Sequence, residues 1–244
     1  MVRYAGISTA LLLVVVAALV RAQEEAMPVF HEPHHRQVFH AGPTRILDGR
    51  IPPGDISLYH THDHPILYVT FSSSQTKTET LGQENATPPA GRGGGRGRGP
   101  LPPPPGISGL RMNSTTSYVE RPITHRIANM GERMFLFMAV VNESAGNDSQ
   151  SVSEAGFTGE PEVTNKWFRA YRTVLAPGES TPKHKHTMPA VLIQTTEGTA
   201  VASGGIKWEL DEPTRWAWFE AGDAHDIKNL GSRPLEIVEI EVRR

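Results

Sequence analysis

A histidine spacing that occurs twice is the feature of this chain that most limits how it can fold. Gly54 and Gly178, which are 124 residues apart, are each followed after five residues by a His-x-His pair. The two pairs are His60 with His62 and His184 with His186. A spacing repeated at a fixed offset indicates an internal duplication, which has to be recognised before a fold is assigned.

A second set of residues recurs at a shorter offset of 100. Its members in the first copy are Tyr118, Val119, Glu120, His125, Ile127 and Asn129, and their counterparts are Trp218, Phe219, Glu220, His225, Ile227 and Asn229. The two offsets differ by 24 residues, and a Gly- and Pro-rich segment of about that size, residues 86–109, lies between the two sets in the first copy only. The sequence therefore indicates a duplicated module whose first copy carries an insertion.

The composition of this insert predicts a disordered loop. Its glycines and prolines cannot bury a core or maintain a regular backbone. Arg-Gly clusters can also bind nucleic acid, but the run contains only Arg92, Arg96 and Arg98. A flexible insertion is the favoured interpretation.

The first 22 residues have the features of a secretory signal peptide. Arg3 gives a basic start, an apolar run covers residues 10–20, and Val20-Arg21-Ala22 offers a small-residue cleavage site. An uncleaved membrane anchor is the alternative, but the apolar run is shorter than the roughly 20 residues that a spanning helix needs. We expect an exported protein, periplasmic or extracellular, that is not held in a membrane after cleavage.

Charge and cysteine content exclude several functions. Without Arg3 and Arg21, 22 of the 24 basic side chains remain against 26 acidic ones. This mildly acidic balance argues against nucleic acid as a partner. The chain has no cysteine, so it cannot use disulfides, thiolate ligands or cysteine nucleophiles, and histidine must carry any transition-metal chemistry.

Short apolar segments rich in β-branched and aromatic residues predict strands. They cover residues 66–71, 135–141, 190–194 and 235–242, and the last of them alternates apolar with acidic residues. Turn residues separate the segments, and none of them has a sustained helical period. The pattern indicates an all-β sandwich or barrel.

These observations divide the chain into five parts. We expect a signal peptide over residues 1–22, an N-terminal arm over 23–43, a first domain over 44–142, a linker over 143–162 and a second domain over 163–244. The arm contains His31, His34, His35 and His40. These histidines could capture a metal, but their spacing matches no ligand set, so a solvated arm is favoured.

The repeated histidines are candidate metal ligands. Side chains alternate between the two faces of a strand, so both histidines of a His-x-His pair point the same way. A third imidazole can come from a neighbouring strand, and three neutral imidazoles with open positions suit a divalent transition metal: iron, manganese, zinc, nickel or copper. The candidate ligands are His60, His62 and His125 in the first copy and His184, His186 and His225 in the second.

The two histidine-containing segments resemble the two sequence motifs of the cupin superfamily. The first motif begins Gly-x5-His-x-His, and residues 222–229 match the second, Gly-x2-His-x3-Asn. The first copy keeps His125 and Asn129 but lacks that glycine. The resemblance covers roughly residues 44–243 and implies a bicupin: an all-β chain of two cupin-like double-stranded β-helix (jelly-roll) barrels with a metal inside the barrel.

Both copies depart from the family at one ligand. The first cupin motif usually supplies a glutamate shortly after its second histidine, but Val191 stands there in the second copy and Leu67 in the first. The resemblance then implies a three-histidine variant, a group that includes dioxygenases. An all-neutral ligand set leaves the charge of the metal uncompensated, which favours an anionic substrate, and the missing carboxylate removes a candidate general base.

Other polar residues near the histidines could contact a bound molecule. The candidates for ligand binding are Tyr59, Tyr68, His64 and Gln194, and no catalytic residue is identified. Glu120 and Glu220 could act as acids or bases, but a role at a turn or rim is favoured. Asn129 and Asn229 are interpreted as turn or strand-end hydrogen-bonding residues rather than ligands.

The sequence therefore predicts an exported metal-binding bicupin that acts as a small-molecule metalloenzyme, either an oxygenase or a related lyase. The same fold also hosts proteins that only bind a small ligand, and this is the alternative. The sequence leaves open whether the chain forms a homodimer.

Overall fold

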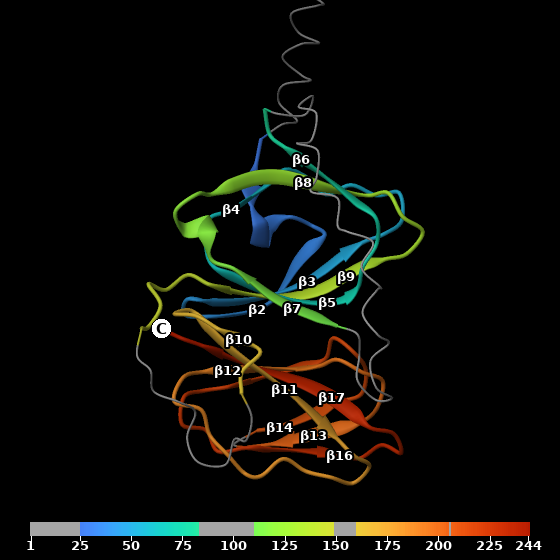
Figure 1. Cartoon of the computed structure of the whole chain (residues 1–244), viewed down its shortest axis with the longest axis vertical. Helices are drawn as coiled ribbons and strands as arrows, with labels where there is room; N and C mark the ends of the chain where they lie inside the picture. Colours follow the sequence, from blue (N-terminus) through green and yellow to red (C-terminus); the bar gives the residue numbers. More distant parts are fainter. Residues whose placement is uncertain (1–24, 83–109, 149–159, 205) are drawn as a thin grey trace, which may run out of the picture.

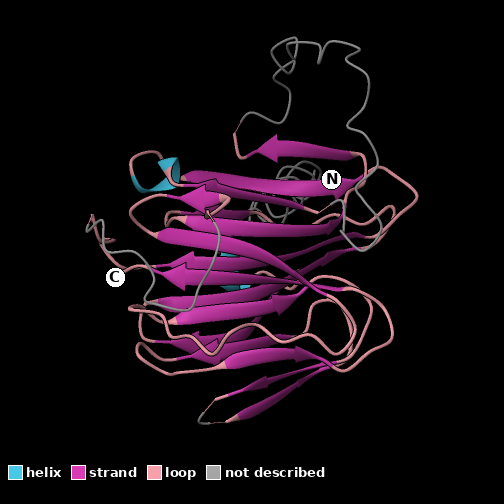
Figure 2. Cartoon of the chain, turned by 60° about the horizontal axis from the view of Figure 1, so that its bottom comes forward, coloured by secondary structure: helices cyan, strands magenta, loops and turns pink. Residues whose placement is uncertain are grey.

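The computed structural model of the chain describes residues 25–82, 110–148, 160–204 and 206–244. The expected signal peptide, the insert at residues 86–109 and most of the expected linker lie outside the described residues. Strands make up nearly all of the described secondary structure (Figure 2), apart from two 3-10 turns, Val29–His31 (η1) and Ser117–Val119 (η2). No helix in these parts of the chain is long and apolar enough to cross a membrane.

The first half of the chain forms two sheets. The outer sheet has the order β1-β4-β8-β6 and contains Met27–Pro28, His60–His62, Ile123–Asn129 and Thr76–Thr80. The inner sheet has the order β2-β3-β9-β5-β7 and contains His35–Ala41, Thr44–Ile51, Phe135–Asn142, Ile66–Ser72 and Arg111–Thr115.

The second half repeats this plan. Its inner sheet has the order β10-β11-β17-β12-β15 and contains Val163–Thr164, Phe168–Leu175, Leu235–Val242, Ala190–Gln194 and Trp216–Phe219. Its outer sheet has the order β14-β13-β16 and contains Lys207–Leu210, Ala200–Ser203 and Asp226–Asn229. The four sheets are stacked along the long axis of the molecule, with the two inner sheets in the middle (Figure 1).

The registers of the strands confirm the duplication. The β3–β9 pairing runs from Thr44 opposite Asn142 to Ile51 opposite Phe135. The β11–β17 pairing runs from Phe168 opposite Val242 to Leu175 opposite Leu235. The second register is the first one shifted by 124 residues on one strand and by 100 on the other, the two offsets that the sequence shows. His60 lies opposite His125 and His184 opposite His225 in the same way.

A shared core joins the two halves. Buried side chains on the facing sides of the two inner sheets form one cluster, with Ile46, Leu67, Val69, Met138 and Val140 from the first half and Phe168, Ala170, Val191, Ile193, Val238, Ile240 and Val242 from the second. The opposite face of each inner sheet lines the interior of its own barrel, where Leu47 and Phe137 lie in the first and Leu192 and Ile237 in the second. Each fully buried aliphatic side chain stabilises the fold by about 1.5–3 kcal/mol, so this core couples the folding of the two barrels.

The repeated glycines occupy turns that favour glycine. Gly54 and Gly178 have φ angles of +77° and +78°, in the left-handed region that side chains with a Cβ rarely adopt. Their backbone N–H groups donate to the carbonyl oxygens of Asn129 and Asn229 at 2.9 and 3.0 Å. Each turn thereby fixes the chain shortly before its His-x-His pair.

Asn229 closes the loops at the end of β16. Its amide N–H groups donate to the carbonyl oxygens of Leu175 at 3.0 Å and Arg233 at 2.8 Å, and its Oδ1 accepts from the N–H of Gly231 at 2.8 Å. Asn129 makes the corresponding bonds to Ile51, Arg133 and Gly131. These contacts bear out the interpretation of both asparagines as hydrogen-bonding residues.

Asn229→Ala should lower the free energy of unfolding by roughly 3 kcal/mol, because three hydrogen bonds of about 1 kcal/mol each are lost and buried carbonyl groups stay unpaired. Urea unfolding measures this change. Asn113→Ala, on the exposed side of β7, is the control and should shift stability by less than about 0.5 kcal/mol. Equal effects of the two substitutions would contradict the prediction.

The N-terminal segment is folded onto the first barrel, which corrects the interpretation of residues 25–43 as a solvated arm. β1 pairs in parallel with β4, and β2 pairs with β3 at the edge of the inner sheet. Val29, Glu32 and His35 are buried. Composition suggested a polar lead-in, but Val29 packs in the apolar core of the first barrel and the ring of His35 packs on that of His60.

Candidate metal centres

The backbone brings two histidines of the second barrel face to face. The N–H of His184 donates to the carbonyl oxygen of His225 at 2.9 Å, and the reverse bond measures 2.8 Å. His186 follows two residues later and projects to the same side as His184. All three side chains are at most 3% exposed. The structure thus brings together the three candidate ligands of the second copy.

A fourth group, Glu239 on β17, completes this cluster. Its Oε2 atom lies 3.0 Å from Nε2 of His184, 3.0 Å from Nε2 of His186 and 3.1 Å from Nε2 of His225. The ligand atoms of all four residues lie within 4.8 Å of one another. Glu239 Oε1 is buried and has no hydrogen-bond partner within the described residues. Three imidazoles therefore converge on one carboxylate oxygen.

The other ring nitrogen of each histidine is also held by an oxygen atom. Nδ1 of His184 donates to the carbonyl oxygen of Pro182 at 2.9 Å, and Nδ1 of His225 lies 3.1 Å from that of Asp223. Nδ1 of His186 lies 3.0 Å from Oε1 of Glu241. Each imidazole thus sits between two oxygen acceptors, an arrangement that orients Nε2 toward the centre of the cluster.

This arrangement fits a divalent metal ion. An imidazole between two oxygen acceptors either carries two protons or gives up the Nε2 proton to a metal. Two ligand atoms that are each about 2.1 Å from one ion and at right angles to each other are about 3.0 Å apart. The three Nε2–Oε2 distances of the cluster, 3.0, 3.0 and 3.1 Å, match this value.

The carboxylates control the protonation of the metal-free site. Burial alone would lower the pKa of His186, but the hydrogen bonds and negative charges of Glu239 and Glu241 outweigh it and raise the pKa to about 9. Burial also opposes the raised pKa of His184, which Glu239 produces in the same way. Burial would raise the pKa of Glu239, but hydrogen bonds from the three imidazoles hold it well below its ordinary value. A metal entering this site must displace protons.

A buried ion pair supports His186 from outside the cluster. Arg169 lies opposite Glu241 in the β11–β17 pairing, and its Nη1 is 3.3 Å from Glu241 Oε2. Both side chains are buried. The guanidinium compensates a carboxylate that would otherwise be a buried charge, and this carboxylate orients the imidazole of His186.

The first barrel holds its three candidate ligands in a different electrostatic setting. The ligand atoms of His60, His62 and His125 lie within 4.8 Å of one another, and all three residues are buried. Nδ1 of His60 donates to the carbonyl oxygen of Leu58 at 2.9 Å, so Nε2 keeps its lone pair. Nε2 of His60 and Nε2 of His125 are buried without a hydrogen-bond partner in the described parts of the chain.

These imidazoles are neutral at physiological pH. Burial, followed by the charges of neighbouring histidines, lowers the pKa of His60 to about 3, of His62 to about 2 and of His125 to about 4. Position 139 on β9 corresponds to Glu239 on β17, and it is Ala139. The first cluster therefore has lone pairs available for a metal but no carboxylate from the last strand.

The candidate ligand-binding residues have separate locations. The ring of Tyr59 lies 4.6 Å below the guanidinium of Arg126, and Gln194 donates to backbone carbonyls of its own turn at 2.8 and 2.9 Å. His64 is partly exposed beside Asp63. Tyr68 packs edge-on against Phe137, an interior residue of the first barrel, with ring centroids 5.8 Å apart.

Glu239 was not identified from the sequence, although a signal for it was present. Acidic residues alternate with apolar ones in the strand at residues 235–242, and the structure buries every residue of that strand. An acidic side chain in a fully buried strand requires a partner or a metal. The three-histidine set expected from the cupin motif is joined in the second barrel by this carboxylate from another strand.

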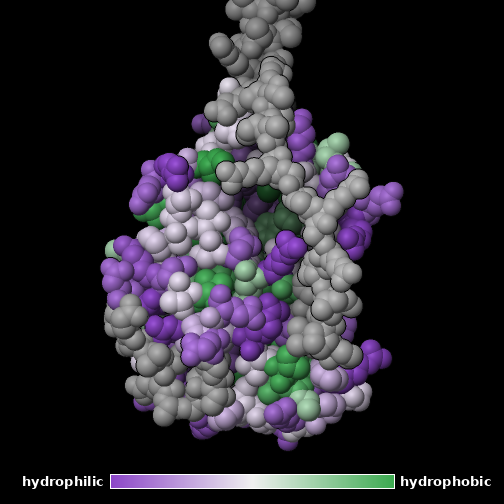
Figure 3. All heavy atoms as spheres, viewed as in Figure 1, coloured by the Kyte–Doolittle hydropathy of each residue, from purple (hydrophilic) through white to green (hydrophobic). Residues whose placement is uncertain are grey.

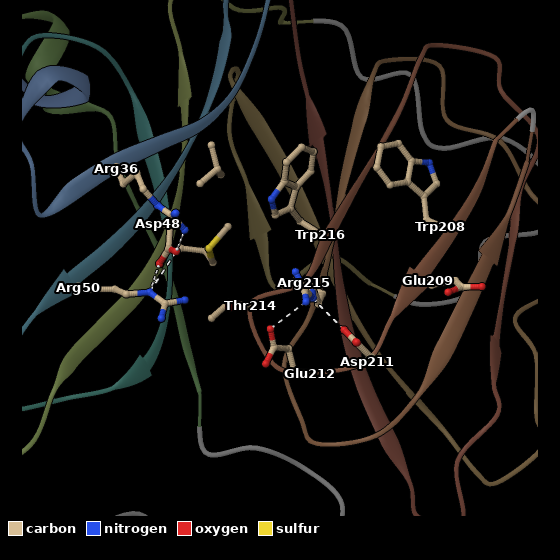
Figure 4. A pocket seen from close by; sticks show the side chains of 12 residues that line it. Arg36, Asp48, Arg50, Trp208, Glu209, Asp211, Glu212, Thr214, Arg215 and Trp216 are labelled. Atoms are coloured by element: carbon tan, nitrogen blue, oxygen red, sulfur yellow. Dashed lines mark hydrogen bonds and ion pairs between the residues drawn. The ribbon is translucent and has the colours of Figure 1, made fainter.

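A cleft of about 440 Å³ lies between the two barrels, away from both histidine clusters. Arg36, Asp48 and Arg50 of the first barrel line one side, and Arg215 and Trp216 of the second lie opposite (Figure 4). Its arginines pair with carboxylates of their own barrel: Arg36 and Arg50 with Asp48, and Arg215 with Asp211 and Glu212. These charges satisfy one another within the protein.

The surface offers no broad apolar region on the face seen in Figure 3. Among the described residues of that face, hydrophobic side chains show as small separate groups surrounded by hydrophilic ones. Scattered apolar residues of this kind are normal on protein surfaces. The candidate metal-binding histidines are instead buried inside the barrels.

Comparison with known proteins bears on the fold. No protein-family model and no curated protein matches the sequence. The solved structure of AerE from Microcystis aeruginosa superposes on this chain with a TM-score of 0.57 at 10% sequence identity, covering 84% of this chain and 90% of AerE. This similarity spans both barrels and, at such low identity, shows the fold alone.

Two further solved structures are similar to a lesser degree. A cupin 2 conserved barrel domain protein from Leptotrichia buccalis has a TM-score of 0.47 at 11% identity, covering 85% of this chain and 87% of its own. Oxalate decarboxylase from Bacillus subtilis, a protein with Mn(II) centres, has a TM-score of 0.48 at 10% identity, covering 87% and 72%. With the topology described above, the expected fold class of two cupin-like jelly-roll barrels is confirmed.

Proposed function

We propose that this chain is a metal-dependent protein whose second barrel binds a divalent transition metal through His184, His186, His225 and Glu239. The observation that carries the proposal is the convergence of three Nε2 atoms on one oxygen of Glu239 at 3.0–3.1 Å. Iron, manganese, zinc, nickel and copper all accept this mixed nitrogen and oxygen ligand set.

We propose further that the centre is catalytic and acts on a small molecule, as an oxygenase or a related lyase. Four protein ligands leave positions free on a six-coordinate ion, at which a bound metal would supply Lewis-acid or redox chemistry. Glu239 neutralises one of the two positive charges, so the remaining charge favours an anionic substrate. Because Glu239 Oε1 has no hydrogen-bond partner in the described residues, it can accept a hydrogen bond from a molecule bound beside it.

A non-catalytic role in binding a small ligand is the second candidate. The ring of Phe219 lies flat on the imidazole of His225, with centroids 3.8 Å apart and an interplanar angle of 5°. This contact and the full burial of the four ligands restrict access to the centre. A closed metal centre of this kind would support a structural or ligand-holding barrel rather than turnover.

Metal content and turnover separate these candidates. The purified chain, prepared without chelators and offered each of the five metals in turn, should retain at least one equivalent. His186→Ala should lose the second-barrel ion and stay folded, because the barrel core is apolar. Oxygen uptake or cleavage of small carboxylic acids that disappears in His186→Ala would support the enzyme. Retained metal without turnover of any of them would favour the binding role, and no retained metal would refute the centre.

Export and assembly are also proposals. The basic start and apolar run of residues 1–22 support cleavage and export, and N-terminal sequencing of protein recovered outside the cytoplasm tests this. The acidic balance of the chain supports a small molecule rather than nucleic acid as its partner. Light scattering of the purified chain distinguishes a monomer from a homodimer.

A further inference from the structure

The cleft of about 440 Å³ between the barrels is an edge of their interface that side chains leave open. Among the described residues, no hydrogen bond or ion pair crosses it. The duplication gives the interface a corresponding edge, where β7 meets β10, and there the barrels are joined directly. Asn165 donates to Ser114 Oγ at 3.2 Å, and Arg172 donates to the carbonyl oxygen of Leu110 at 3.2 Å. Residue 172 is the counterpart of Asp48 at the offset of 124, so the open edge is a feature of one side only.

Two tryptophans form an aromatic wall on the side of the cleft that belongs to the second barrel. The rings of Trp208 and Trp216 have centroids 6.0 Å apart and planes tilted by 38°, and both side chains are half-buried (Figure 4). Trp167 and Trp218, outside the cleft, donate their indole N–H groups to oxygen atoms of the protein. The indole N–H groups of the two cleft tryptophans have no such partner within the described residues. In the strand register of the first barrel, Met112 takes the place of Trp216.

Charged side chains line the rest of the cleft and nearly cancel one another. They are three arginines and four acidic residues: Arg36, Arg50, Arg215, Asp48, Glu209, Asp211 and Glu212. The arginine side chains are 67%, 53% and 52% exposed. Arg50 uses only its Nε to bond both oxygens of Asp48, so its Nη groups can still donate. A charged ligand of either sign would meet like charges here, and this balance favours a neutral molecule.

A strained turn fixes the rim of the cleft. Thr214 has a φ of +75°, and among the described residues it is the single residue other than glycine with a positive φ. Its N–H donates to the carbonyl oxygen of Gln194 at 3.0 Å, and the N–H of Gln194 donates to that of Arg215 at 2.8 Å. Backbone strain held in place by surrounding bonds is concentrated at functional sites such as ligand clamps.

We propose that this cleft binds a neutral oligosaccharide. Sugar rings have apolar C–H faces that can pack on an indole, and their hydroxyl groups both donate and accept hydrogen bonds. The cleft supplies the matching parts: two tryptophans, unused N–H donors and carboxylate acceptors. Its volume lies within the roughly 300–1,000 Å³ of ordinary small-molecule sites. A nucleotide would instead bring its phosphate groups against four carboxylates.

Calorimetric titration of the full chain with maltotriose, cellotriose, xylotriose and chitotriose tests the proposal, with trigalacturonate as the charged comparison. At least one neutral trisaccharide should bind with a Kd of about 1 mM or tighter. Trp208→Leu should weaken that binding by about tenfold, because it removes a flat ring and an N–H donor. Arg50→Gln, on the opposite wall, should weaken it by about fivefold.

Trp218→Leu is the matched control, because Trp218 is on β15 with Trp216 but does not line the cleft. It should change affinity by less than about twofold. His186→Ala should bind the same sugar unchanged, which separates this site from the proposed metal centre. If Trp208→Leu does not fold by circular dichroism, Arg50→Gln decides. No binding of any neutral trisaccharide, tighter binding of trigalacturonate, or full affinity in the cleft variants would overturn the proposal.

Discussion

Replacing Glu239 with glutamine should weaken divalent metal binding by the second barrel more than about 100-fold. The substitution removes the negative charge and replaces one oxygen of the carboxylate on which three Nε2 atoms converge with an amide NH2 group. Loss of a residue that merely orients a ligand already costs 10- to 100-fold in affinity, so loss of a ligand should cost more. Competition with a chelator of known affinity, in a His62→Ala background that disables the first cluster, measures the change.

The control for this prediction is Glu209→Gln. Glu209 is on β14 in the same barrel, and its side chain is 78% exposed. It carries the same charge but does not contact the histidines, so its substitution should leave metal affinity within about twofold, the ordinary range for an exposed charge. A Glu239→Gln chain that retains a tightly bound ion would show that the three imidazoles suffice and that the carboxylate is not a ligand.

The metal affinity of the second barrel should rise with pH between 6 and 8, whereas that of the first barrel should stay nearly constant. In the second barrel the ion must displace a proton from His186, whose pKa in the metal-free site is about 9. Below that pKa each unit of pH changes the fraction of free lone pairs tenfold, so affinity should rise about 100-fold from pH 6 to pH 8. In the first barrel the pKa values of the three imidazoles lie at about 4 or below. Those rings are already neutral at pH 6, so affinity there should be nearly constant.

Two variants, each with only one remaining histidine cluster, allow the two barrels to be measured separately. His62→Ala reports the second barrel and His186→Ala the first, each titrated with Zn²⁺ at pH 6, 7 and 8. Glu239→Gln should also reduce the pH dependence of any residual binding in the second barrel, because it removes one of the two carboxylate charges that raise the pKa of His186. If Zn²⁺ affinity depended on pH equally in the two variants, the charge difference assigned to the two clusters would be contradicted.

The duplicated spacing predicted the internal repeat, and the resemblance of the repeated segments to the cupin motifs implied the two-barrel fold. Side-chain alternation placed His60 with His62 and His184 with His186 on common faces, and the offsets of 124 and 100 reappear in the strand registers. A spacing of this kind depends on backbone geometry alone. For the same reason, the turn glycines and Asn229 could be interpreted from sequence.

Glu239, the fourth member of the second cluster, could not be predicted in this way. It reaches His186 across 53 residues of chain. This contact does not follow from local spacing, because it depends on which strand lies beside which in the closed barrel. Val191 stands at the expected carboxylate position, but its side chain faces the core between the barrels, so a search along the motif could not find the ligand.

The stacking of the inner sheets has a mechanical consequence for the two centres. β17 carries Glu239 on one face, while Val238 and Ile240, its neighbours on that strand, pack in the core shared with the first barrel. A displacement of β17 that moved Glu239 away from the histidines would also push these two side chains against the other barrel. β17 therefore couples the second metal centre mechanically to the core that both barrels share.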